Sequence, residues 1–326
     1  MEEILRLFPD QIKSTIKSKI SERWGVLQEI RFRLNQPIEL IFDNNHIEWI
    51  DKIVPTRKDS IYVLNQISQF SLYRMEDELR EGYVTLEGGH RVGLAGKVNT
   101  LNGSVKAIQH ITFFNIRIAK EKIGAALSVL PYIYTRKYLN TLLVGPPQTG
   151  KTTIIRDITR LIATGWNNIP ANKVAVIDER SEIGGSLKGM PQHNLGLRSD
   201  VMDACPKAEG MMMMIRSMSP DVLIVDEIGS YKDVQALMEA VHAGVVVICT
   251  IHGESLEELK KRPSLQELFQ HNVFGRIIVL DKHSTPGHIK RIYNHKQENI
   301  LHKVEVTPHE VDWSTSFHRH NNLDRI

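Results

Sequence analysis

The chain is poor in cysteine and in long apolar runs. Its 326 residues include only two cysteines, Cys205 and Cys249, which do not form a C-x-x-C pair. We therefore expect reduced thiols packed in a core rather than a disulfide framework. The most apolar stretch, residues 243–251, is far shorter than the roughly 20 residues that a membrane span requires. The beginning of the chain lacks the basic-then-apolar order of a signal peptide. These absences predict a cytoplasmic protein whose membrane contact, if it has one, is peripheral at the inner face.

A large excess of charge is missing as well. The chain carries 41 Lys and Arg against 38 Asp and Glu, a formal net charge of +3. A nucleic-acid binder needs a basic face, and these totals show none, so no nucleic-acid partner is expected. The alternation Ile30-Arg31-Phe32-Arg33-Leu34 is a local exception. Because of Arg31 and Arg33, a nucleic-acid-dependent motor stays open as an alternative.

Residues 1–120 mix the patterns of helices and strands, which predicts a smaller α+β domain. Apolar spacing favours helices over residues 1–20 and 72–81. Strands are expected at residues 30–34, 37–42 and 111–118. A hairpin over residues 83–94 is expected to turn at the paired glycines Gly88 and Gly89.

Residues 121–282 show the pattern of an α/β core with a parallel sheet. Residues 120–136 predict a helical connector interrupted at Pro131. Short apolar runs then alternate with helical segments, which favours a parallel sheet covered on both faces. Its strands are expected at residues 139–144, 173–178, 222–226, 245–250 and 273–280. Residues 283–326 form a polar, histidine-rich tail with one edge-strand candidate at residues 289–293.

The strongest functional signal is a complete G-x-x-x-x-G-K-[ST] motif between an expected strand and an expected helix. Its glycines let backbone N–H groups turn toward phosphate oxygens. We expect Lys151 to contact the β- and γ-phosphates of ATP, and the Thr152 hydroxyl to bind Mg²⁺. The residues predicted to bind the nucleotide are Gly145, Pro146, Pro147, Gln148, Thr149, Gly150, Lys151, Thr152 and Thr153.

Polar groups at the ends of three expected strands complete the candidate site. Asp226 and Glu227 end one strand, where Asp226 is expected to hold magnesium through a water molecule and Glu227 to orient or deprotonate the attacking water. His252 follows the next strand and is expected to sense the γ-phosphate. Residues 178–182 form a further acidic cluster near the phosphate loop. Its acid Glu179 is expected to help place water or magnesium.

Four segments in this order resemble the secretion-ATPase family, the hexameric motors of type II and type IV secretion and of pilus retraction. They are the phosphate-binding motif, an acidic box at residues 177–182, the strand at residues 220–227 and the histidine box at residues 250–252. Two details depart from the family: its first two box acids are exchanged here, and Asp226 stands where glycine is common. Residues 30–34 and 82–96 resemble a sporulation branch of the same family.

The resemblance implies a RecA-like P-loop NTPase core and a homo-oligomeric ring, with a hexamer as the family's number. It also implies that the amino-terminal domain rests on a neighbour's nucleotide site, with Arg91 and Arg117 facing the γ-phosphate as arginine fingers. A surface or interdomain salt bridge is the alternative for each arginine. The implied partner is a membrane-associated protein of a sporulation transenvelope complex, moved by ATP hydrolysis. A non-hydrolysing ATP-binding scaffold remains an alternative, and the choice between ATP and GTP stays open.

Overall fold

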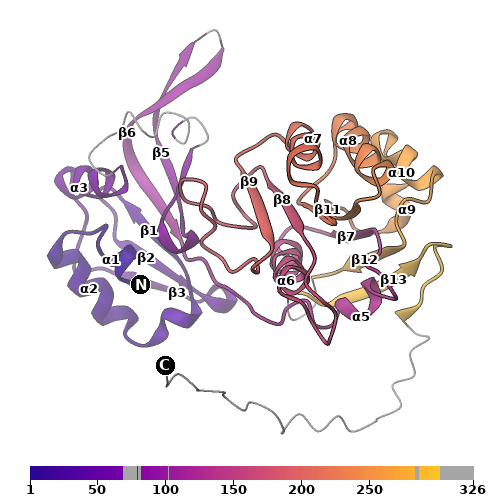
Figure 1. Cartoon of the computed structure of the whole chain (residues 1–326). Coiled ribbons are helices and arrows are strands. Elements are labelled where there is room, and N and C mark those ends of the chain that lie inside the picture. The colour runs from indigo at the N-terminus through magenta and orange to yellow at the C-terminus, as the bar shows by residue number, and fades with distance from the viewer. Residues whose placement is uncertain (69–78, 80–81, 102, 283–285, 302–326) are drawn as a thin grey trace, which may run out of the picture.

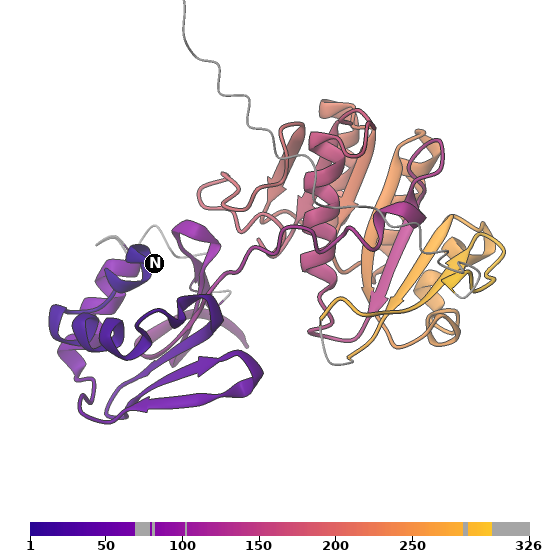
Figure 2. The same cartoon turned by 90° about the horizontal axis from the view of Figure 1, so that it is seen from below.

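The computed structural model describes residues 1–68, 79, 82–101, 103–282 and 286–301. Within these ranges the chain forms two domains that lie side by side (Figure 1), and the view from below shows the same separation (Figure 2). The amino-terminal domain is a sheet with helices against one face. The second domain is a larger sheet between two layers of helices.

An antiparallel six-stranded sheet in the order β3-β2-β1-β6-β5-β4 forms the amino-terminal domain. Its strands are β1 (Leu27–Arg33), β2 (Ile38–Phe42), β3 (Ile47–Ile50), β4 (Tyr83–Thr85), β5 (Arg91–Leu101) and β6 (Ser104–Arg117). The helices are α1 (Glu2–Leu5), α2 (Asp10–Ile20) and α3 (Arg57–Ile67). The predicted helix at residues 72–81 lies outside the described residues except for Leu79. The predicted strands and the hairpin are confirmed: Gly88 and Gly89 have φ of +81° and +75° between β4 and β5.

Side chains alternate between the two faces of this sheet. On β1, Ile30 and Phe32 are fully buried, whereas Arg31 and Arg33 lie on the opposite face and are partly exposed. The Phe32 ring centroid lies 5.8 Å from that of Phe8 and 5.7 Å from that of Phe114. These rings form the centre of the domain's core.

Replacing Phe32 by alanine is expected to lower the free energy of unfolding by about 3–5 kcal/mol, because a cavity opens among these rings. Urea denaturation measures the change. Phe113→Ala is the matched control, because Phe113 pairs with Arg33 across the same strands but is 44% exposed. Its expected change is within about 0.5 kcal/mol. Equal losses in both variants would contradict this assignment of the two faces.

The connector between the domains differs from its prediction. Residues 120–136 contain one short helix, α5 (Leu130–Ile133), and otherwise follow turns and irregular chain. The prediction of a helix interrupted at Pro131 is therefore wrong. Pro131 lies in the first turn of α5, where an N–H would have no helical partner. The apolar spacing was misleading because Ala126 and Val129 are buried against the second domain without forming a helix.

A seven-stranded sheet in the order β13-β12-β7-β11-β10-β8-β9 forms the second domain. All neighbouring strands are parallel except β13, which pairs antiparallel with β12. The strands are β7 (Thr141–Gly145), β8 (Val174–Asp178), β9 (Ser199–Asp203), β10 (Val222–Val225), β11 (Val246–His252), β12 (Arg276–Leu280) and β13 (Ile289–Asn294). The helices are α6 (Lys151–Thr164), α7 (Lys207–Met218), α8 (Tyr231–His242), α9 (Leu256–Leu259) and α10 (Gln266–Gln270).

Both faces of this sheet are buried, as the continuous apolar runs predict. Helices α5 and α6 pack on one face, and α7 to α10 pack on the other (Figure 1). The five predicted strands are confirmed with small shifts in their ends. Strand β9 was missed because its sequence, SDVMD, is polar and lies at the sheet edge, where it pairs only with β8. Among the described helices, none has the length and apolar character that crossing a bilayer requires.

The predicted edge strand in the tail is β13, and it completes the sheet of the second domain. The chain between β12 and β13 also reaches the phosphate-binding loop. There the Gly287 N–H donates to the Thr149 carbonyl oxygen at 2.9 Å. Residues 286–301 therefore support the site as well as the sheet.

Candidate active site

The predicted phosphate-binding motif forms a tight loop between the end of β7 and the start of α6 (Figure 1). Gly150 has φ of +87°, a conformation that disfavours a β-carbon, and a β-carbon on Gly145 would lie 2.6 Å from Thr149 Oγ1. Helix α6 has 14 residues, and its first N–H groups lack partners inside the helix. Such a helix start after a curled loop is a favourable place for phosphate groups.

Lys151 lies inside this curl and is only 5% exposed. Its Nζ donates to the carbonyl oxygens of Gly145 at 2.8 Å and Pro146 at 2.9 Å, and to His252 Nδ1 at 3.2 Å. Burial lowers the pKa of the ammonium group, and the nearby carboxylates of Asp226 and Glu227 partly oppose this effect. A buried cation in a loop of this shape fits the phosphates of a nucleotide.

The two predicted magnesium ligands are neighbours. Thr152 Oγ1 donates to Asp226 Oδ2 at 2.8 Å, and Thr250 Oγ1 on β11 donates to Asp226 Oδ1. Burial raises the pKa of Asp226, because a charged carboxylate is poorly solvated there. The hydroxyl and carboxylate oxygens of Thr152 and Asp226 are ligands that Mg²⁺ prefers.

Within the described ranges, no group of three or more His, Cys, Asp or Glu side chains is arranged to hold a metal ion. Magnesium often binds proteins through one or two oxygen ligands, with substrate phosphates and water completing its coordination. The pair Thr152 and Asp226 fits that mode and fits no all-protein metal centre.

Glu227 follows Asp226 in a strained backbone conformation, with φ of 53°. Its N–H donates to Thr250 Oγ1 at 2.8 Å, which holds this conformation. Its carboxylate has a neighbour at each oxygen: His252 Nε2 lies 2.6 Å from Oε1, and Arg180 Nη1 donates to Oε2 at 2.8 Å. The predicted water-activating and phosphate-sensing residues are therefore in direct contact.

The hydrogen bond between Lys151 and His252 indicates which ring nitrogen of His252 carries the hydrogen. A charged Lys151 ammonium can only donate, so His252 Nδ1 accepts and Nε2 carries the hydrogen. That Nε2–H donates to Glu227 Oε1. Lys151, His252 and Glu227 thus form one hydrogen-bonded chain.

The acids of the predicted acidic box have different partners. Asp178 is buried, and its two oxygens accept from the N–H groups of Glu182 and Gly184, both at 2.8 Å. Burial raises the pKa of Asp178 to about 6, although these hydrogen bonds oppose the shift. Asp178 therefore shapes the loop that follows β8. Glu179, which was predicted to help bind the cofactor, forms an ion pair with Lys207 at the start of α7.

The predicted arginine fingers lie on neighbouring strands of the amino-terminal sheet, where Arg91 pairs with Arg117 in register. Arg91 Nη1 donates to Glu182 Oε1 of the second domain at 2.5 Å, and its guanidinium lies 3.9 Å from the Tyr83 ring centroid. Arg117 is largely exposed, and its Nε lies 3.8 Å from Glu29 Oε1. Arg91 thus forms the interdomain salt bridge that was the alternative to a finger.

A cavity of about 270 Å³ lies between the two domains. The amino-terminal side contributes Arg91, Arg117 and Lys120 to its lining, and α6 contributes Thr152 and Arg156. Both predicted finger residues therefore face the same space as the Thr152 hydroxyl, within a single chain. Glu182 also lines this cavity and pairs with Arg91, while Arg117 pairs with Glu29 and Lys120 with Asp43.

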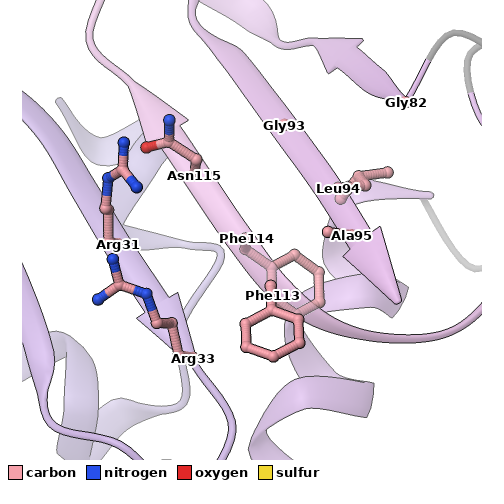
Figure 3. Close-up of a pocket in the computed structure, with 9 residues that line it drawn as sticks. All are labelled: Arg31, Arg33, Gly82, Gly93, Leu94, Ala95, Phe113, Phe114 and Asn115. Carbon is pink, nitrogen blue, oxygen red and sulfur yellow. The ribbon is translucent and has the colours of Figure 1, made fainter. Parts of the chain in front are cut away.

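The arginines that kept a nucleic-acid motor open are neutralised by neighbouring acids. Arg31 Nε lies 3.0 Å from Glu29 Oε2, and Arg33 Nη1 lies 2.6 Å from Glu39 Oε2. Figure 3 shows both arginines on one face of β1 beside the aromatic ring of Phe113. Since each guanidinium has its own carboxylate, this face offers little net charge to a phosphate backbone.

Three residues of the site were given no individual role from the sequence, although Arg180 lies in the acidic box and Thr250 in the histidine box. Thr250 joins Asp226 to Glu227, Arg180 contacts Glu227, and Arg156 donates to the carbonyl oxygen of Glu182 at 2.6 Å. Arg180 and Glu227 are 47 positions apart, so no local pattern joins them. Arg156 offered a usable signal, because it lies four residues after Thr152 on the same helix face.

Comparison with known proteins identifies relatives that match most of the chain. The family model described as "Sporulation stage III, protein AA" matches residues 1–300. Stage III sporulation protein AA of Bacillus subtilis (strain 168) is 49% identical over 304 residues, which is 93% of this chain and 98% of that protein. The match includes both domains.

Two solved structures share the fold. The ATPase DotB of Legionella pneumophila superposes with a TM-score of 0.57 at 13% identity, over 84% of this chain and 76% of that one. The pilus retraction motor PilT, solved with bound ADP, gives a TM-score of 0.57 at 17% identity, over 85% of this chain and 77% of that one. They confirm the predicted fold class, a RecA-like P-loop core preceded by a smaller α+β domain, and at this identity they support the fold alone.

Proposed function

The chain belongs to the sporulation stage III protein AA family, and from this we propose that it is a magnesium-dependent ATPase with a motor role in sporulation. One observation carries the proposal: Thr152 donates to Asp226 beside the buried Lys151, while the adjacent Glu227 is held by His252. Measuring ATP hydrolysis with and without magnesium, in the wild type and in site variants, tests it.

Each residue of the site has a distinct task in this proposal. The loop N–H groups and Lys151 bind the phosphates of ATP, and Thr152 and Asp226 hold the magnesium ion. Bound there, a magnesium ion would supply positive charge that offsets the negative charge of the phosphates. Glu227 accepts a proton from the attacking water at a carboxylate oxygen. His252 orients that carboxylate through its Nε2–H.

Arg91 is proposed to stabilise the charge that develops on the transferred phosphoryl group. Replacing Arg91 by alanine is expected to lower ATP turnover on the order of a thousand-fold, as for other arginine fingers. Steady-state hydrolysis at saturating ATP measures it.

Glu182→Gln is the matched control for Arg91→Ala, because it breaks the same interdomain ion pair and leaves the arginine in place. Its expected loss of turnover is less than about ten-fold, the range of a partly exposed ion pair. Equal losses in the two variants would show that Arg91 serves only as a salt bridge between the domains.

The proposed mechanical work follows from the two-domain arrangement and from the family resemblance. ATP binding would clamp the amino-terminal domain on the core, and hydrolysis would release it. In a hexameric ring, this motion would act on a membrane-associated protein of the sporulation complex. Sedimentation velocity of Glu227→Gln with ATP and magnesium tests the ring: a six-chain particle is expected. A monomer at every concentration would remove the ring from the proposal and leave the ATPase.

A further inference from the structure

Arg180 contacts Glu227, the proposed water-activating residue, at the carboxylate oxygen that His252 does not contact. Its Nη1 donates to Glu227 Oε2 at 2.8 Å, while His252 occupies Oε1. With a donor on each oxygen, the plane of the Glu227 carboxylate is fixed at both ends. His252 alone would leave the carboxylate free to rotate about its single contact.

The segment that carries Arg180 is held firmly by the second domain. Ser181 has a left-handed backbone, with φ of 50°, and its Oγ donates to Asp203 Oδ1 at 2.6 Å. The Glu182 N–H donates to Asp178 Oδ1 at 2.8 Å, and Arg156 Nη2 donates to the Glu182 carbonyl oxygen at 2.6 Å. The strained backbone of Ser181 is stabilised by these contacts, and backbone strain of this kind is common at functional sites.

The amino-terminal domain holds the same segment from the other side. The Tyr83 hydroxyl donates to the Arg180 carbonyl oxygen at 3.4 Å, and Arg91 pairs with the Glu182 carboxylate. Residues of both domains therefore fix the backbone of the segment that carries Arg180.

The ion pair between Arg180 and Glu227 is expected to contribute little to the stability of the fold. The Arg180 side chain is 61% exposed and that of Glu227 is 19% exposed. Exposed ion pairs contribute little to stability, because water screens them and ordering two side chains costs entropy. The backbone of this segment is fixed by several contacts, and the Arg180 side chain that it carries reaches Glu227. The effect of this side chain on the carboxylate explains the contact better than its contribution to stability does.

We infer that Arg180 is a positioning residue, which holds the Glu227 carboxylate in the orientation that accepts the proton of the attacking water. The inference rests on the proposed ATPase function. Arg180 acts through Glu227, so its removal changes the rate of the chemical step rather than the affinity for ATP.

The test compares Arg180→Ala, Arg180→Lys and the control Arg262→Ala by steady-state hydrolysis. Arg262 is also a partly exposed arginine of the second domain, paired with Glu258. Arg180→Ala is expected to lower kcat on the order of ten- to a hundred-fold through the misplaced carboxylate, with KM changed less than about three-fold. Arg180→Lys is expected to recover part of the loss, and Arg262→Ala to match the wild type. Wild-type kcat in Arg180→Ala, or no recovery in Arg180→Lys, would overturn the inference.

A second readout does not depend on turnover and separates this inference from the proposed function. Carbodiimide labelling of Glu227, followed by peptide mass spectrometry, reports how well the carboxylate is covered. Labelling is expected to rise several-fold in Arg180→Ala and less in Arg180→Lys. If the wild type hydrolyses no ATP, the proposed function fails, but the labelling still shows whether Arg180 covers the Glu227 carboxylate. Equal labelling in the wild type and Arg180→Ala would then overturn the inference.

Discussion

Replacing Glu227 by glutamine is expected to lower ATP hydrolysis by about a hundred- to ten-thousand-fold, the usual contribution of a general base. Glutamine keeps the shape of the side chain, and the backbone N–H of residue 227 can still donate its hydrogen bond to Thr250 Oγ1. It cannot accept a proton from water. ATP affinity is expected to stay within about three-fold of the wild type, because Glu227 makes no contact with the phosphate loop's lysine except through His252.

Glu239→Gln is the control for this prediction, since Glu239 is an exposed glutamate on the outer side of α8. It should hydrolyse ATP like the wild type. If Glu227→Gln also turned over at the wild-type rate, another group would be the base. If neither the wild type nor Glu227→Gln hydrolysed ATP while both bound it, the non-hydrolysing scaffold would replace the motor.

Replacing Lys151 by alanine is expected to abolish turnover and to weaken ATP binding on the order of ten- to a hundred-fold. Lys151 is the buried cation inside the phosphate loop, and a hydrogen bond from a charged donor contributes about 1.5–3 kcal/mol. Titration with a fluorescent ATP analogue measures the affinity. The loss is larger in turnover because the same group also stabilises the charge that develops on the transferred phosphate.

Lys232→Ala serves as the control for Lys151→Ala, because Lys232 is exposed in the first turn of α8. Its affinity for the analogue should equal that of the wild type. Undiminished binding by Lys151→Ala would mean that the nucleotide does not lie in this loop.

The fold was predictable where the sequence pattern is local and apolar. The buried strands β7, β8, β10, β11 and β12 are continuous runs of branched apolar residues, so their place in a doubly covered parallel sheet could be inferred. Strand β9 could not be, because an edge strand pairs on one side only and tolerates polar residues such as Ser199 and Asp200. The helix predicted at residues 120–136 was wrong because apolar side chains with helical spacing can also be buried on a chain without regular structure.

The site residues were predictable where they belong to one continuous sequence motif with a known chemical role. Lys151 and Thr152 are fixed by their place at the start of α6, and Asp226 and Glu227 by the end of β10. The residues that orient these groups come from other strands. Thr250 is 24 positions from Asp226, and Arg180 is 47 from Glu227. Only the side-by-side packing of β8, β10 and β11 brings them together.

The most direct test of the central proposal is magnesium-dependent ATP hydrolysis by the wild-type protein over a range of protein concentrations. Turnover is expected only with magnesium, because Thr152 and Asp226 are proposed to hold the ion. Turnover per chain is expected to rise with concentration as rings assemble, and Glu227→Gln should show none above background. Hydrolysis that is unaffected by removing magnesium, or equal in the wild type and Glu227→Gln, would contradict the proposal.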